Sequence, residues 1–204
     1  MISKNSKLLA VSFALTSCLI SSSLSLPALA VEGRSAAPPV VEETIQNKPF
    51  QVSKIAVNAR PDQVWAILTD YHSAPLVFPT VKKCQLLADK GSTKVVHHEV
   101  RPSGVMKNFA YQLELKEHGH HKLEWRRVSG DFKEVEGFWK LEPTDGGRRT
   151  LVTYASYVNG GFWMPQALIK RQFRIDMPAV MTALKSHAEK TVHLASRKTE
   201  NRTP

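Results

Sequence analysis

The chain has two kinds of hydrophobic pattern, and the boundary between them falls in its last quarter. Between residues 50 and 158, apolar and polar residues alternate in short runs separated by turn-forming residues. In the run 108–117, Phe109 and Tyr111 share one face while Gln112 lies on the other. Successive side chains of a strand point to opposite faces, so this alternation predicts half-buried antiparallel strands.

Two stretches depart from this alternation and predict helices. After Pro61, which suits the first helical position, Val64, Trp65 and Leu68 recur at helical spacing. A much longer helical pattern covers residues 165–193. The predicted order is therefore one strand, a small helical pair, about six antiparallel strands and one long C-terminal helix. A curved sheet with one apolar face needs a cover, and only the last helix is long enough to provide it.

The first thirty residues have the pattern of an export signal. Lys4 and Lys7 precede an apolar stretch, and small residues at Ala28 and Ala30 fit a signal-peptidase site. We therefore expect a signal peptide at 1–30 and an exported protein, periplasmic or lumenal. Serines interrupt the apolar stretch, which weakens the alternative of a retained membrane anchor.

A second processing route starts from Cys18. The run Leu15–Cys18 resembles a bacterial lipobox, in which the cysteine becomes the lipidated first residue. Apolar residues continue after Cys18, unlike the polar tether usually found there. The alternative to cleavage after Ala30 is thus a lipid-anchored protein.

The remaining boundaries follow from composition. Residues 31–49 contain Pro38 and Pro39 with little periodicity and are predicted to be a linker. The folded domain is expected at 50–193, and the polar end 194–204 is expected to be a disordered tail.

Four segments in this order resemble the START-like (SRPBCC) superfamily, and within it the polyketide cyclase/dehydrase and lipid-transport group, which includes coenzyme-Q-binding proteins. The segments are Ala59–Trp65, Gly137–Pro143 with the pattern G-x-W-x-L-x-P, Thr150–Tyr154, and the helix around 173–188. The resemblance implies an α+β helix-grip fold, in which a curved antiparallel sheet of about seven strands wraps a long C-terminal helix. It also implies a cavity between sheet and helix. Carriers and enzymes both use this fold, so the ligand stays open.

The predicted cavity lining is mainly aromatic. If the alternation is interpreted correctly, the sheet contributes Phe109, Tyr111, Leu123, Trp125, Trp139 and Tyr154, and the helix contributes Phe173 and Met177. Apolar concave sites are the usual ligand sites of proteins. The alternative is a filled core without a cavity, which the same pattern would produce.

Two polar residues share the parity of these apolar neighbours. His98 and Arg127 could bind a carboxylate, a quinone oxygen or a phosphate inside a cavity. For Arg127, release to solvent at the end of its strand is the alternative. We predict no catalytic residue, metal site or cofactor, because no nucleophile–base spacing, phosphate loop or metal motif is present.

The segment joining the last strand to the helix carries Gly160 and Gly161 followed by Phe162, Trp163 and Met164. These apolar residues predict either a lid over the cavity, which would place Phe162 and Trp163 on the ligand, or peripheral membrane contact through this loop. The alternative is a plug in which the two rings pack on the core.

Charge narrows the range of partners. The 204-residue chain has a formal net charge of +10, and residues 31–204 carry +8 of it. The basic residues are scattered without a long Lys/Arg block, so we expect no nucleic-acid partner. Our main hypothesis is an exported protein that holds or carries a hydrophobic small molecule such as a lipid, quinone or isoprenoid. A cyclase/dehydrase-type enzyme using the same cavity is the alternative, and an interaction protein with a filled core is a third hypothesis.

Overall fold

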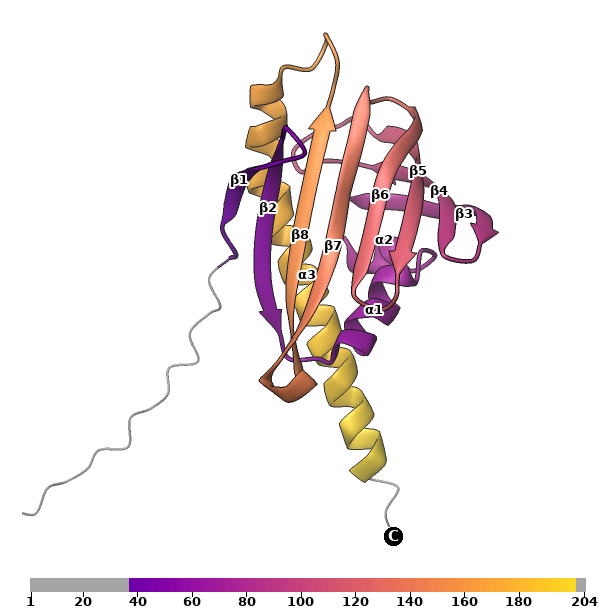
Figure 1. Cartoon of the computed structure of the whole chain (residues 1–204), viewed down its shortest axis with the longest axis vertical. Helices are drawn as coiled ribbons and strands as arrows, with labels where there is room; N and C mark the ends of the chain where they lie inside the picture. The colour runs from indigo at the N-terminus through magenta and orange to yellow at the C-terminus, as the bar shows by residue number, and fades with distance from the viewer. Residues whose placement is uncertain (1–36, 201–204) are drawn as a thin grey trace, which may run out of the picture. The chain divides into compact units, whose positions relative to one another are not determined.

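Eight antiparallel strands form a single sheet in the computed structural model, which describes residues 37–200 (Figure 1). The strands lie in the order β1-β2-β8-β7-β6-β5-β4-β3. In chain order the elements are β1 (Val40–Ile45), β2 (Lys48–Val57), α1 (Pro61–Thr69), α2 (Ala74–Val77), β3 (Val81–Lys90), β4 (Thr93–Val100), β5 (Phe109–His118), β6 (Lys122–Gly130), β7 (Glu134–Thr144), the 3-10 turn η1 (Asp145–Gly147), β8 (Arg149–Asn159) and α3 (Gln166–Glu200).

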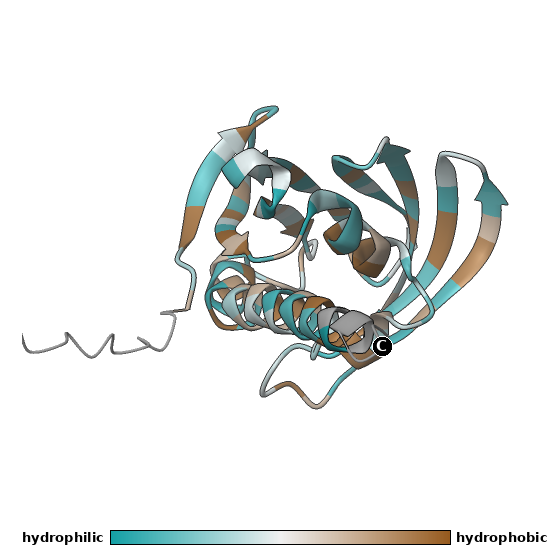
Figure 2. Cartoon of the chain, turned by 90° about the horizontal axis from the view of Figure 1, so that it is seen from below, coloured by the Kyte–Doolittle hydropathy of each residue, from teal (hydrophilic) through white to brown (hydrophobic). Residues whose placement is uncertain are grey.

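The sheet curves around α3, as the view along the helix shows (Figure 2). The concave face and α3 enclose the core, which includes Leu141 and Val152 from the sheet and Met181 and Leu184 from the helix. The predicted α+β helix-grip fold is therefore confirmed. The predicted export signal at 1–30 and the lipobox lie outside the described residues.

Helix α1 forms where the sequence predicts it. Pro61 occupies its first turn, and the backbone N–H of Arg60 donates a hydrogen bond to Gln63 Oε1 at 2.9 Å. The residues at helical spacing, Val64, Trp65 and Leu68, are all buried against the core.

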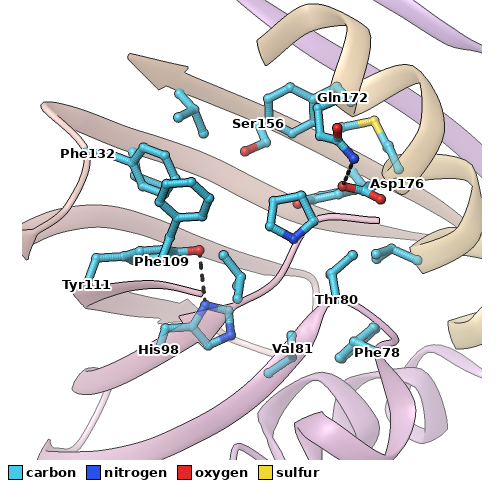
Figure 3. A pocket seen from close by; sticks show the side chains of 18 of the residues that line it. Phe78, Thr80, Val81, His98, Phe109, Tyr111, Phe132, Ser156, Gln172 and Asp176 are labelled. Atoms are coloured by element: carbon cyan, nitrogen blue, oxygen red, sulfur yellow. Dashed lines mark hydrogen bonds between the residues drawn. The ribbon is translucent and has the colours of Figure 1, made fainter. Parts of the chain in front are cut away.

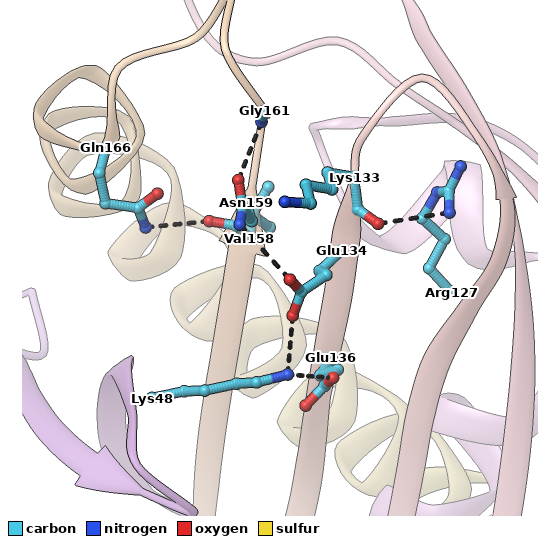
Figure 4. A network of polar contacts seen from close by, with 9 residues as sticks. All are labelled: Lys48, Arg127, Lys133, Glu134, Glu136, Val158, Asn159, Gly161 and Gln166. Atoms are coloured by element: carbon cyan, nitrogen blue, oxygen red, sulfur yellow. Dashed lines mark hydrogen bonds and ion pairs between the residues drawn. The ribbon is translucent and has the colours of Figure 1, made fainter.

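Strand β1 corrects the predicted linker 31–49 and raises the strand count from about seven to eight. It is an edge strand whose middle residues are exposed, so it lacks the alternating pattern that marks half-buried strands. Gln46 and Asn47 have positive φ values of 50° and 62°, as in the two-residue turns that close β-hairpins. Lys48, at the start of β2, reaches across β8 to pair with Glu134 at 2.7 Å and Glu136 at 2.6 Å on β7 (Figure 4).

Helix α3 corrects the predicted domain end at 193 and residues 194–200 of the predicted disordered tail 194–204, because it continues to Glu200, while 201–204 lie outside the described residues. No glycine or proline interrupts the chain between Pro178 and Pro204, so nothing local ends the helix early. The polar composition that predicted a tail also suits the solvated end of a helix.

Candidate ligand-binding cavity

A cavity of about 740 Å³ lies between the concave face of the sheet and α3 (Figure 3). Residues from α1, α2, strands β3 to β8, the β4–β5 loop and α3 line it, and most of them are apolar. Its volume falls in the range of about 300 to 1,000 Å³ that is typical of small-molecule sites. The structure thus has a cavity where the alternative hypothesis expected a filled core.

One side of the cavity is a set of stacked rings that we call the aromatic wall, made of Trp125, Trp139 and Tyr154 on β6, β7 and β8. Trp139 and Tyr154 stack with ring centroids 4.1 Å apart, and the Trp125 ring lies 5.8 Å from Tyr154. Phe78, just after α2, extends the stack at 6.2 Å from Trp139. Such pairs add to the stabilisation that burial of the rings provides.

Gly137 makes room for this wall. It pairs with Trp125 across β6 and β7, and a Cβ at this position would lie 2.1 Å from the indole and 2.5 Å from the Ala155 carbonyl oxygen. The first residue of the G-x-W-x-L-x-P segment is therefore a glycine because the indole of Trp125 occupies the space that a Cβ would take.

His98 on β4 and Tyr111 on β5 form a polar pair in the otherwise mainly apolar lining of the sheet (Figure 3). His98 Nδ1 lies 3.3 Å from the Tyr111 hydroxyl. Burial, with a smaller contribution from His97, lowers the pKa of His98 to about 4, so its imidazole is neutral at pH 7. Burial also raises the pKa of Tyr111 above its ordinary value and that of Tyr154 to about 12.

The exposed residues of the cavity lining gather at what we call the mouth, between the β4–β5 loop (101–108) and the first turns of α3. Ser103 N–H donates to Asp176 Oδ1 at 3.1 Å, and Gln172 Nε2 donates to Ser103 O at 3.1 Å and to Asp176 Oδ2 at 2.8 Å. Beside these bonds, Leu168 and Ile175 are 56% and 50% exposed although they line the cavity. Hydrogen bonds from Ser103 thus join the loop to α3, and apolar side chains in contact with solvent lie beside them.

The structure brings together eight of the eleven predicted site residues. The cavity is lined by His98, Phe109, Tyr111, Trp125, Trp139, Tyr154, Phe173 and Met177, together with the predicted Leu123. Their binding of a ligand stays a prediction.

Arg127 does not line the cavity, so its predicted place there is wrong. It pairs with Leu113 in the β5–β6 register, but it stands near the strand end. Its guanidinium donates to the carbonyl oxygens of Gly130 at 2.8 Å and Lys133 at 3.3 Å in the β6–β7 turn (Figure 4). Alternation correctly placed Arg127 on the same face as Leu113. Its long side chain, however, reaches the carbonyl oxygens near the turn and does not enter the cavity.

Phe162 and Trp163 also lie outside the cavity lining, and at 91% and 90% exposed they are neither a lid in contact with the cavity nor a plug on the core. Met164 does line it, against Gly160, where a Cβ would lie 2.4 Å from the methionine side chain. Gly161 has φ +75° and donates its N–H to Asn159 Oδ1 at 2.9 Å (Figure 4). The turn at the two glycines thus places Met164 in the cavity lining and leaves the rings of Phe162 and Trp163 exposed to solvent.

Sequence reasoning missed two groups of lining residues. Phe132, in the β6–β7 turn, stacks on Phe109 at 5.1 Å and meets Tyr111 edge-on at 5.5 Å. An aromatic residue inside a polar turn was the available signal. Gln172 and Asp176 are a polar pair four residues apart on the face of α3 that otherwise carries apolar side chains, and this spacing places them side by side.

Other chemistry is limited in the described part of the chain. Burial raises the pKa of the Cys84 thiol, which lines the cavity, to about 11, so the thiol is protonated at pH 7. No three metal-ligating side chains converge within residues 37–200. Among the described helices, none combines the length and apolar character that a membrane span needs.

These features define the chain as a START-like helix-grip protein, with a cavity between a curved antiparallel sheet and its C-terminal helix. The sequence profile of the polyketide cyclase/dehydrase and lipid transport family matches residues 57–185, and the chain belongs to this family. No curated protein matches the chain in sequence.

Solved structures agree with this assignment of the fold. The STAR-related lipid transfer protein from Xanthomonas axonopodis is 16% identical with a TM-score of 0.64, and the match covers 76% of this chain and 94% of that one. The ZhuI aromatase/cyclase from a Streptomyces species is 18% identical with a TM-score of 0.62, covering 70% and 94%. Human STARD10 is 11% identical with a TM-score of 0.62, covering 83% and 76%. At these identities the likeness shows the fold alone.

Proposed function

We propose that this protein is an exported carrier that holds a hydrophobic small molecule, such as a lipid, quinone or isoprenoid, in the cavity under α3. The observation that carries the proposal is the cavity of about 740 Å³ with its mainly apolar lining. Transfer of apolar ligand surface from water into such a lining is favourable by about 25 cal/mol per Å². The lipid transfer protein among the similar structures supports a carrier of this kind.

Ligand binding can be tested with native mass spectrometry and with 1-N-phenylnaphthylamine, a probe that fluoresces in apolar sites. We expect one probe per protein, and we expect Ser156→Phe to abolish binding because Ser156 lines the cavity and the added ring would fill it. Tyr157→Phe, at the next position of β8, is outside the lining and serves as the control. A protein that neither carries an extractable compound nor binds the probe would contradict the carrier function.

Export rests on the first thirty residues alone. Intact mass and cell fractionation decide between a mature chain that starts at Val31 and a lipidated chain that starts at Cys18. A full-length chain in the cytoplasm would contradict both routes.

Membrane contact is the second part of the proposal. The exposed rings of Phe162 and Trp163 lie 5.4 Å apart in the loop that leads into the mouth through Met164, and the exposed Arg171 stands on the first turns of α3. Aromatic rings with nearby cations suit the interface of an anionic bilayer. We expect flotation with vesicles that contain phosphatidylglycerol and a loss of flotation in Phe162→Ala/Trp163→Ala. Leu86→Ala/Leu87→Ala removes two other exposed apolar residues on β3 and should float normally.

The cyclase/dehydrase alternative rests on one observation, the His98–Tyr111 pair, because a neutral imidazole can accept a proton. The aromatase/cyclase among the similar structures has the same fold. Chemical change of a bound aromatic polyketide precursor by the wild type and not by His98→Leu would favour the enzyme. Release of bound compounds unchanged favours the carrier.

A further inference from the structure

We propose that the cavity selects an uncharged ligand bearing a carbonyl or hydroxyl oxygen, and that His98 and Tyr111 bind this oxygen. The inference deepens the proposed function and rests on it, since it names the class of molecule that the cavity holds. It excludes the carboxylate and phosphate that His98 could have bound on sequence grounds.

The charges around the cavity argue against an anionic ligand. The fully charged side chains in the lining are Arg171 and Asp176, and both stand at the mouth. Arg171 is exposed, while Asp176 accepts hydrogen bonds from Ser103 and Gln172. A carboxylate beside His98 would therefore have no cation of the cavity lining next to it except Arg171 at the mouth, and desolvating an unpaired charge costs several kcal/mol.

A further negative charge stands behind the lining. The hydroxyl of Tyr71, a lining residue in the turn between α1 and α2, donates to Glu117 Oε1 at 2.7 Å. This carboxylate and Asp176 both oppose the entry of an anion, and the neutral imidazole of His98 does not attract one.

The His98–Tyr111 contact leaves one hydrogen-bond donor for a ligand in either tautomer. If the Tyr111 hydroxyl donates to Nδ1, then Nε2 of the neutral ring carries the proton. If Nδ1 instead carries the proton and donates it to the Tyr111 oxygen, the hydroxyl hydrogen of Tyr111 can be donated to a ligand. Within the described residues, the contact between the two side chains is the one hydrogen bond that either the His98 ring or the Tyr111 hydroxyl makes. A ligand oxygen that accepts one hydrogen bond satisfies both arrangements.

A ligand without such an oxygen would bind less well. A pure hydrocarbon would pack against the apolar lining and displace the water from the cavity. It has no oxygen, so the hydrogen-bond donor of His98 or Tyr111 would then have no acceptor. An unpaired buried donor costs about 1 to 3 kcal/mol, which corresponds to a loss of about 5- to 150-fold in affinity. The cavity therefore favours an apolar body with one neutral oxygen over either a hydrocarbon or an acid.

The test compares retinol with retinoic acid at pH 8, where the acid is ionised. The two probes share one polyene, and each quenches the fluorescence of Trp125 and Trp139 if it enters the cavity. We expect the wild type to bind retinol at least about tenfold more tightly than retinoic acid. His98→Leu and Tyr111→Phe should each weaken retinol binding by about fivefold or more while 1-N-phenylnaphthylamine still binds.

His97→Leu is the matched control. His97 neighbours His98 on β4 but is absent from the cavity lining, and its Nε2 lies 3.3 Å from Glu99 Oε1. It should leave both affinities unchanged.

Three results would overturn the inference while the carrier function stands, provided that 1-N-phenylnaphthylamine binds. They are equal affinities for retinol and retinoic acid, tighter binding of the acid, and retinol binding that neither His98→Leu nor Tyr111→Phe weakens. A failure of all three probes to bind would instead contradict the proposed function itself.

Discussion

The aromatic wall and the mouth line one cavity, yet they are held by different interactions. The wall consists of stacked rings fixed by close packing, down to the missing Cβ of Gly137. The mouth consists of a loop joined to α3 by the hydrogen bonds of Gln172 and Asp176. Close packing resists small changes in volume, whereas partly exposed hydrogen bonds exchange readily with water.

This difference assigns separate tasks to the two regions. A rigid wall fixes the shape that a ligand must match, and a weakly held mouth allows the ligand to enter without unfolding the domain. Helix α3 takes part in both, because Leu168 is half exposed at the mouth while Leu184, beyond Pro178, is fully buried. Variants on the packed side should therefore change stability, and variants at the mouth should change access.

The largest effect should come from a methyl group at Gly137. Gly137→Ala would place a Cβ within 2.1 Å of the Trp125 ring and 2.5 Å of a backbone oxygen, so the free energy of unfolding should fall by about 4 kcal/mol. Gly104→Ala at the mouth is the matched control. Nothing lies within 4 Å of its Cβ, and only its φ of +75° costs energy, about 1 kcal/mol. Urea unfolding measures the free energy of unfolding of both variants. Equal losses would show that the aromatic wall is packed no more tightly than the mouth.

A second pair of variants lies on α3 itself. Leu184→Ala should lower the free energy of unfolding by about 3 kcal/mol, because it opens a hole in the packed core. Leu168→Ala removes the same atoms from a half-exposed position and should change it by no more than about 0.5 kcal/mol. Thermal or urea unfolding of the two proteins gives the contrast, and similar values would show that α3 is anchored uniformly.

The buried imidazole of His98 should make stability depend on pH. Its pKa is about 4 in the folded protein and about 6.5 when unfolded, so below pH 6.5 the unfolded chain binds the extra proton and is favoured. The titratable groups beside it are Cys84 on β3 and Tyr111 on β5, with His97 and Glu99 on its own strand, while Tyr154 and Asp176 line the same cavity. The His98 contribution should decrease by about 2 kcal/mol between pH 7 and pH 5.

His98→Gln keeps a polar side chain that does not titrate and should lack this part of the dependence. Urea unfolding of wild type and variant at pH 7 and pH 5 isolates the difference. Parallel losses in the two proteins would show that carboxylates, such as the paired Glu134, account for the change instead.

The smallest effect on stability should follow from Gln172→Ala. It removes two hydrogen bonds at the mouth, so the free energy of unfolding should fall by less than about 1 kcal/mol. The release of bound retinol should nevertheless become faster, since among the described residues the β4–β5 loop then keeps one hydrogen bond to α3, from Ser103 to Asp176. Stopped-flow displacement measures the rate, and an unchanged rate would mean that the ligand leaves by another route.

Alternation and helical spacing predicted the order of the elements and most of the residues on the concave face, whereas the helix-grip fold and the cavity followed from the resemblance to the START-like superfamily. Period-2 patterns identified Phe109, Tyr111, Trp125, Trp139 and Tyr154, because these positions alternate with residues on the other face of the sheet. The same pattern could not detect strand β1, which buries little, or follow the long side chain of Arg127 to its turn.

The mouth was harder to predict than the wall for a physical reason. Its residues come from a loop and a helix that meet only in three dimensions, as Ser103 and Asp176 do. Local periodicity carries no information on such a contact. The exposure of Phe162 and Trp163 was likewise undecided, because an apolar loop can face either core or solvent.

The position of β1 sets how far the domain could act from a membrane. Its first residue is Val40, so 21 residues would separate it from a lipid anchor at Cys18. A chain of 21 residues spans at most about 70 Å. A lipidated protein would thus exchange its cargo only within this distance of its own bilayer, whereas the form cleaved after Ala30 could shuttle between two membranes.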